Sequence, residues 1–121
     1  MTNLIIQTNV NITDENIDDI MVGALEGGIT YWCSECRVVD KYLGKYASEQ
    51  ISRGGQLVFV VPDDDKGEYV MNKSHFLKGL QMFLEQHPEC IVDGELDTCL
   101  IDGMYADCII QYALFGELVF G

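Results

Sequence analysis

Lysine and arginine are scarce in this chain of 121 residues, which has seven of them against twenty aspartates and glutamates and a formal net charge of −13. All seven lie between Arg37 and Lys78, so residues 1–36 and 79–121 contain no lysine or arginine. A field of one sign repels nucleic acid and attracts basic protein surfaces over roughly a Debye length. The scarcity argues against direct nucleic-acid binding and favours a basic protein surface as the partner.

The sequence also lacks long apolar runs and segments typical of linkers between domains. No run approaches the ~18 residues that span a bilayer, and the N-terminus lacks the basic stretch that begins a signal peptide. The chain has only two prolines, no low-complexity tract and no visible internal repeat. We therefore expect one domain over residues 1–121, located in the cytoplasm and without contact to a membrane.

Catalytic motifs are absent as well. The sequence contains no Gly-x-Ser-x-Gly, no His-Glu-x-x-His, no phosphate-binding loop that ends in Lys-Ser/Thr and no Gly-x-Gly-x-x-Gly. The two histidines occupy ordinary surface positions, His75 in the first turn of a predicted helix and His87 directly before a proline. We expect a protein that is not an enzyme.

Apolar stripes at helical spacing predict three helices with recognisable ends. The first stripe is formed by Ile17, Ile20, Met21, Ala24 and Leu25. Capping residues and glycines mark where each helix begins and stops. The first helix should begin at Thr13 and end at Gly27-Gly28. The second should begin at Asn72 or Ser74 and end at His87-Pro88, and the third should run from Asp102 to Gly116. A short additional helix is predicted over residues 47–53, before Gly54-Gly55.

The remaining segments predict strands and loops. Residues 3–12 alternate as a half-buried strand does, and residues 56–61 and 68–71 form a hairpin around a polar turn. Residues 29–46 are expected to be irregular and rich in aromatics, residues 89–101 an acidic loop or edge strand, and residues 117–120 strand-like. Because strands and helices alternate without regular βαβ order, we expect an α+β fold. Its mainly antiparallel sheet has three to five strands and packs with about three helices.

Two of the five cysteines have a spacing that suits a metal. Cys33 and Cys36 are three positions apart, so both thiolates can reach one Zn²⁺ and form half of a tetrahedral site. No second Cys-x-x-Cys or His-x-x-x-His pair completes it, and the remaining ligands stay undefined. Zinc is therefore a candidate cofactor with Cys33 and Cys36 as ligands. The alternative is that these cysteines are inert thiols.

The candidate partner-binding residues are acids near helix ends and tyrosines near the basic residues. Tyrosine is frequent at the energetic centre of protein interfaces, and surface acids steer a basic partner. The tyrosines lie in the segment that also holds Trp32, Lys41 and Lys45. The set comprises Asp14, Glu15, Asp18, Asp19, Glu85, Glu89, Asp93, Glu95, Asp97, Tyr42 and Tyr46.

Three stretches resemble a known group of proteins. Residues 17–33, 42–55 and 106–121 are similar to a family of small acidic proteins encoded by phages, prophages and other mobile elements of Gram-positive gut bacteria. The family has no assigned chemistry, but such genomes encode acidic proteins that disable host defence. Among them are anti-CRISPR proteins that bind Cas9 and obstruct its positively charged nucleic-acid channels.

The resemblance implies a function. The expected activity is non-enzymatic inhibition of a host nucleic-acid enzyme inside the bacterial host cell. The first candidate partner is a Cas9-type nuclease, whose nucleic-acid access an acidic surface would block. The alternative is a small zinc-stabilised accessory module of a mobile element, with no inhibitory role.

Overall fold

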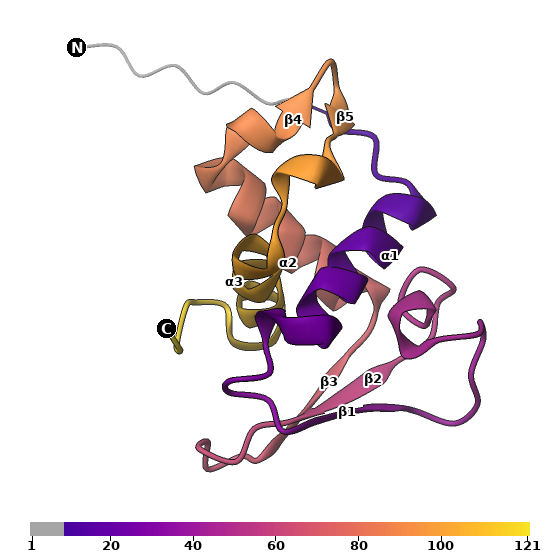
Figure 1. The fold of residues 1–121 in the computed structure, drawn as a ribbon, viewed down its shortest axis with the longest axis vertical. Helices are drawn as coiled ribbons and strands as arrows, with labels where there is room; N and C mark the ends of the chain where they lie inside the picture. The colour runs from indigo at the N-terminus through magenta and orange to yellow at the C-terminus, as the bar shows by residue number, and fades with distance from the viewer. Residues whose placement is uncertain (1–8) are drawn as a thin grey trace.

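Three helices lie over one side of a small antiparallel sheet in the computed structural model, which describes residues 9–121 (Figure 1). The helices are α1 (Asp14–Gly23), α2 (Lys73–Gln86) and α3 (Gly103–Phe115), and α3 contacts both of the others. One hydrophobic core joins all three to the sheet. The α+β prediction is confirmed, with two antiparallel sheets of three and two strands.

The first helix has the ends that its sequence predicts. The Thr13 hydroxyl accepts a hydrogen bond from the Asn16 backbone N–H, and the Asn16 side chain accepts one from the Thr13 N–H. This capping box satisfies amide groups that would otherwise lack partners in the first turn. After Gly23 the chain makes a π turn, η1 (Ala24–Gly28), before the helix stops.

The main sheet contains the predicted hairpin and one strand that the pattern missed. The hairpin strands β2 (Leu57–Val60) and β3 (Glu68–Met71) pair antiparallel, which confirms the prediction. The third strand, β1 (Glu35–Val38), pairs with the other side of β2. Residues 29–46 were predicted to be irregular, and this is wrong at β1. Its alternation covers only four residues, of which Cys36 and Val38 are half-buried, too few to predict a strand.

The second and third helices pack closely as a pair. Asn72 caps α2 by accepting from the His75 backbone N–H, and the helix ends before Pro88 as predicted. Asp102 caps α3, and Gly116 ends it with a left-handed φ of 73°. At Gly79 an added Cβ would lie 2.6 Å from the Ala113 backbone nitrogen, so the two backbones approach as only glycine permits.

The acidic segment after α2 contains short pieces of regular structure. A 3₁₀ turn, η3 (Pro88–Cys90), leads into the two-stranded hairpin β4 (Ile91–Val92) and β5 (Glu95–Leu96), followed by η4 (Thr98–Leu100). The prediction over residues 47–53 is only partly right, because a 3₁₀ turn, η2 (Ala47–Glu49), replaces a longer helix. The predicted strand 3–12 lies largely outside the described residues, and Asn11 forms only an isolated bridge with Glu95.

The segment after α3 is held by a side chain instead of a strand. The Gln111 Oε1 accepts hydrogen bonds from the backbone N–H groups of Val119 (2.8 Å) and Phe120 (2.9 Å). Because a carboxamide occupies these backbone groups, the strand predicted over 117–120 does not form. The Phe120 ring stacks on Trp32, with ring centroids 5.4 Å apart. We call residues 116–121 the C-terminal tail.

None of the helices among residues 9–121 combines the length and the apolar character needed to cross a lipid bilayer.

Candidate protein-binding surface

Two exposed tyrosines lie in the long connection between β1 and η2. Tyr42 and Tyr46 are each 59% exposed, and Leu43 between them is also exposed. We call residues 40–46 the tyrosine loop. Tyrosine is one of the residues enriched at the energetic centre of protein interfaces. Both tyrosines that the sequence nominated are therefore accessible to a partner.

The backbone of the tyrosine loop is held in place by two side chains from the next segment. Gln50, which is buried, accepts a hydrogen bond from Leu43 N (3.0 Å) and donates one to the carbonyl oxygen of Lys41 (3.2 Å). The Glu49 Oε1 accepts from the backbone N–H groups of Lys45 (2.8 Å) and Tyr46 (3.0 Å). The hydrogen bonds from Tyr46 and Lys45 lower the pKa of the Glu49 carboxyl group, so it remains an acceptor at neutral pH.

These contacts order the loop before any partner arrives. Four backbone groups of the loop are satisfied within the chain, while the tyrosine side chains point to solvent. Binding through an ordered loop avoids part of the entropy cost of fixing it in the complex. Tyrosine adds large contact area with few rotatable bonds. The loop is thus suited to protein recognition.

Helix α1 contacts η2, the segment that follows this loop, and several of its acids already have partners. Asp18 accepts a 2.6 Å hydrogen bond from the Ser52 hydroxyl, in the segment that follows η2. Asp14 forms a 3.3 Å ion pair with Lys73. On another side of the helix, Asp19 accepts from the Thr98 hydroxyl at 3.0 Å. Glu15 is exposed.

The remaining nominated acids lie elsewhere on the molecule. Asp93 and Glu95 are exposed in the β4–β5 hairpin, and Asp97 caps η4 by accepting from the Cys99 N–H. Glu85 and Glu89 belong to the end of α2 and to η3, at the upper left of Figure 1, whereas α1 lies on the right. The nine acids therefore do not form one continuous face. They fall into a group on α1 and a group at the end of the molecule that carries η3 and the β4–β5 hairpin (Figure 1).

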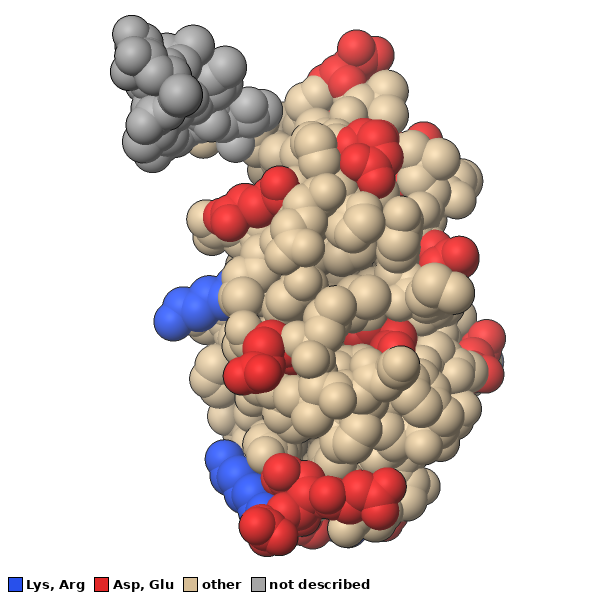
Figure 2. Space-filling view, turned by 90° about the vertical axis from the view of Figure 1, so that its left-hand side faces the viewer, with Lys and Arg blue, Asp and Glu red and all other residues tan. Residues whose placement is uncertain are grey.

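Several basic residues form ion pairs with acids, so they cancel negative charge only locally. Arg37 contacts Glu68 (2.9 Å) and Glu35 (3.4 Å), and Arg53 contacts Glu49 (3.5 Å). Figure 2 shows one face, where acidic side chains form separate patches around a wide uncharged area and few basic side chains appear. The electrostatic surface is thus that of an acidic protein with uncharged areas between the acids.

The cysteine pair does not gather a complete ligand set. Cys33 is buried and Cys36 half-buried, and no group of three Cys, His, Asp or Glu side chains within residues 9–121 is placed to hold a metal ion. Burial first, and then the charges of Cys33 and Glu35, raise the pKa of Cys36 to about 12. Burial likewise raises the pKa of Cys33, Cys90 and Cys108. Reactive thiolates need the opposite shift.

Sequence reasoning identified the exposed tyrosines but missed the residues that order them. Gln50 and Glu49 lie in a stretch read as a short helix, and nothing in their spacing indicates contacts to residues up to nine positions earlier. Gly44 is the one residue whose type reflects the contact between the loop and Glu49, because an added Cβ at position 44 would lie 2.8 Å from the Glu49 Cβ.

Comparison with known proteins gives no relative: no family model, curated protein or solved structure matches this chain.

Proposed function

We propose that this chain is a non-enzymatic protein-binding domain that docks its tyrosine loop against a basic surface of its partner. The observation that carries the proposal is the loop itself, which is ordered by Gln50 and Glu49 and exposes Tyr42, Leu43 and Tyr46. On this proposal the exposed acid Glu15 of α1 supplies a rim contact. The net charge of −13 accelerates the approach of a cationic partner.

The partner class follows from the charge and from the resemblance to mobile-element proteins. A host nucleic-acid enzyme has the extended basic channels that an acidic domain can occupy, and a Cas9-type nuclease is the first candidate. On this proposal the protein acts in the cytoplasm of the bacterial host cell and blocks nucleic-acid access. The raised pKa values of the cysteines support a binding role over thiol catalysis.

Association kinetics with a purified Cas9-type nuclease test the proposal. We expect the association rate constant to fall about tenfold or more between ~50 and ~300 mM salt, because screening weakens steering. Tyr42→Ala and Tyr46→Ala should each raise the dissociation rate constant about tenfold, as truncating an interface tyrosine does. Leu100→Ala, which removes an exposed apolar side chain from η4, is the matched control and should change neither constant.

Two results contradict the proposal. One is an association that is insensitive to salt, which removes the acidic steering. The other is a complex that forms equally well with Tyr42→Ala and Tyr46→Ala as with Leu100→Ala, which removes the tyrosine loop from the interface. Absence of binding to any nucleic-acid enzyme in pull-downs from the host rejects the partner class.

A further inference from the structure

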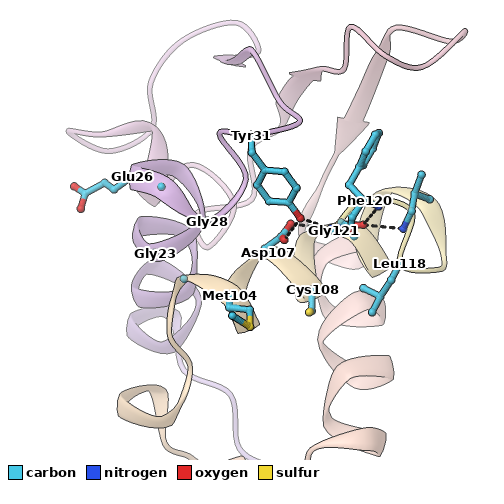
Figure 3. A pocket seen from close by; sticks show the side chains of 14 residues that line it. Gly23, Glu26, Gly28, Tyr31, Met104, Asp107, Cys108, Leu118, Phe120 and Gly121 are labelled. Atoms are coloured by element: carbon cyan, nitrogen blue, oxygen red, sulfur yellow. Dashed lines mark hydrogen bonds between the residues drawn. The ribbon is translucent and has the colours of Figure 1, made fainter.

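A groove of about 980 Å³ opens above the first turns of α3. Figure 3 shows its construction: α3 forms the floor, the glycines that end α1 form one wall, and the C-terminal tail forms the other. The glycine wall approaches α3 closely, because an added Cβ at Gly28 would lie 2.4 Å from the Gly103 carbonyl oxygen. Glycine at position 28 therefore lets the backbone after α1 pack directly against the start of α3.

The groove has accessible apolar side chains on both sides of its centre. Met104 of α3 is 72% exposed, and Leu118 and Val119 of the tail are also exposed. Methionine adapts its shape to different apolar partners, since its side chain is unbranched and flexible. An apolar surface of this kind, lying on two sides of a polar centre, is suited to bind apolar groups that flank a polar one.

The polar centre is Asp107, which is only 6% exposed. Its Oδ1 accepts hydrogen bonds from Trp32 Nε1 (2.7 Å) and Gln111 Nε2 (2.9 Å), and its Oδ2 accepts one from the Tyr31 hydroxyl (2.5 Å). All three donors are neutral. None of the described residues that line the groove is a lysine, an arginine or a histidine, and Asp107 forms no ion pair within residues 9–121.

The negative charge of Asp107 is therefore fixed in position but not neutralised. Neutral donors form hydrogen bonds with the carboxylate oxygens but do not cancel its negative charge. Because this carboxylate is largely shielded from water, its charge attracts a nearby cation more strongly than an exposed carboxylate would. Burial, followed by the hydrogen bond to Asp107, raises the pKa of Tyr31 to about 12, so this donor stays protonated in the physiological range. A cation placed in the groove would be attracted by this buried negative charge, while the groups beside it contact the apolar walls.

We propose that this groove binds a segment of the partner protein in which a lysine or arginine is flanked by apolar residues. The cationic side chain lies over Tyr31 and Asp107, while its neighbours contact Met104 on one side and Leu118 on the other. The inference rests on the proposed function. The tyrosine loop is the first surface that contacts the basic partner, and the groove is a second surface that binds a segment of the same partner. A small cationic molecule lacks the flanking groups that would fill both apolar sides.

A peptide titration tests the groove without any partner protein. The probe is the capped peptide acetyl-Gly-Leu-Arg-Val-Gly-amide, followed by NMR through the methyl groups of methionine. The Met104 methyl should shift and saturate below about 5 mM peptide, while those of the buried Met21 and Met71 stay unchanged. Replacing arginine by citrulline, which is neutral and nearly the same shape, should weaken binding about tenfold or more, because the attraction between the guanidinium and the Asp107 carboxylate is lost.

Two variants locate the effect. Asp107→Asn should remove the preference for arginine over citrulline. If that variant does not fold, Met104→Ser provides the second test, since it alters only an exposed side chain and should weaken binding of both peptides several-fold. Val92→Ser, at an exposed position in β4, is the matched control and should bind as the wild type does.

Clear outcomes overturn the inference. Equal binding of the arginine and citrulline peptides rejects the cationic subsite, and no Met104 shift up to about 5 mM rejects the groove as a peptide site. Equal binding of free arginine amide and the peptide rejects the flanking contacts and indicates a small-molecule site. If the groove variants bind the nuclease normally while the tyrosine variants do not, the proposed function stands and the groove inference fails.

Discussion

The indole Nε1 of Trp32 donates a 2.7 Å hydrogen bond to the Oδ1 of Asp107, 75 positions later in the chain. The bond joins the segment before β1 to the middle of α3 and satisfies a buried carboxylate. Gln111, one turn further along α3, donates to the same oxygen and also holds the C-terminal tail. Because Phe120 of that tail stacks on Trp32, the only tryptophan of the chain reports whether the tail is docked.

Gln111→Ala should release the tail and destabilise the fold. The substitution removes an acceptor for two backbone N–H groups and a donor to Asp107, which together stabilise the protein by about 2–3 kcal/mol. The tryptophan fluorescence of the folded variant should change because Phe120 leaves the indole. Urea unfolding followed by fluorescence measures both effects.

Gln81→Ala is the matched control, because Gln81 is exposed on α2 and its side chain makes a single long hydrogen bond, to Glu85, within residues 9–121. The control should change the free energy of unfolding by less than about 0.5 kcal/mol. Unchanged fluorescence in Gln111→Ala would mean that the tail stays on Trp32 without the carboxamide.

Gly79→Ala should destabilise the protein although alanine favours helices. In an open helix the exchange would add about 1 kcal/mol of stability. Here the new Cβ would lie 2.6–2.7 Å from Ala113 backbone atoms, which cannot move without separating α2 from α3. Overpacking of this kind costs about 1–3 kcal/mol, so the clash outweighs the propensity. Thermal unfolding should show a lowered Tm, whereas Lys78→Ala, exposed on the same helix, should keep the wild-type value.

The helices were predictable because their signals are local. The Thr13 capping box, the Asp102 cap and the left-handed Gly116 each act within four residues of the helix end, so the sequence contains the whole interaction. Strand β1 and the C-terminal tail depend on distant partners. Val38 is placed by its pairing with Leu57, and residues 119–120 are placed by Gln111, neither of which a pattern along the chain reveals.

The residues of the candidate surfaces also include some that the sequence predicts and some that it does not. Exposed Tyr42 and Tyr46 were identified from composition, because tyrosines near basic residues in an irregular segment indicate accessible aromatics. The buried Gln50 that orders them was not identified, and neither was Asp107, which sits in a stripe that reads as apolar. Buried polar residues acquire their role from donors and acceptors brought together by the fold, so sequence spacing does not predict them.

Gln50→Leu should loosen the tyrosine loop while the core remains folded. Leucine fills the same space but leaves Leu43 N and the Lys41 carbonyl without their partner. Amide hydrogen exchange at Leu43 should become about tenfold faster, corresponding to the loss of roughly one hydrogen bond. Gln56→Leu, at an exposed position before β2, is the control and should leave this exchange rate unchanged. Unchanged exchange in Gln50→Leu would show that the loop is ordered by other contacts.

The half-buried thiol of Cys36 makes the fold sensitive to alkaline pH. Its pKa is raised from 9.0 to about 12, mainly because burial disfavours the thiolate. A group whose folded pKa lies above its unfolded pKa binds its proton more tightly in the folded state. It therefore stabilises the fold fully below pH 9, and the contribution is lost as the pH rises from about 9 to about 12. Urea unfolding should show a smaller loss of stability between pH 8 and pH 10 in Cys36→Ala than in the wild type.

The same burial predicts which thiol reacts first. Only the thiolate form attacks an alkylating reagent, so the cysteines with a raised pKa should react slowly at pH 8 in the native protein. Cys99 is the exposed cysteine and should supply the single fast phase with an aromatic disulfide reagent. Cys99→Ser should abolish that phase and leave the slow phases unchanged, and urea should make all remaining thiols react quickly. Fast labelling of Cys33 or Cys36 in the folded protein would contradict the burial, and would reopen the case for thiolate chemistry or metal binding at this pair.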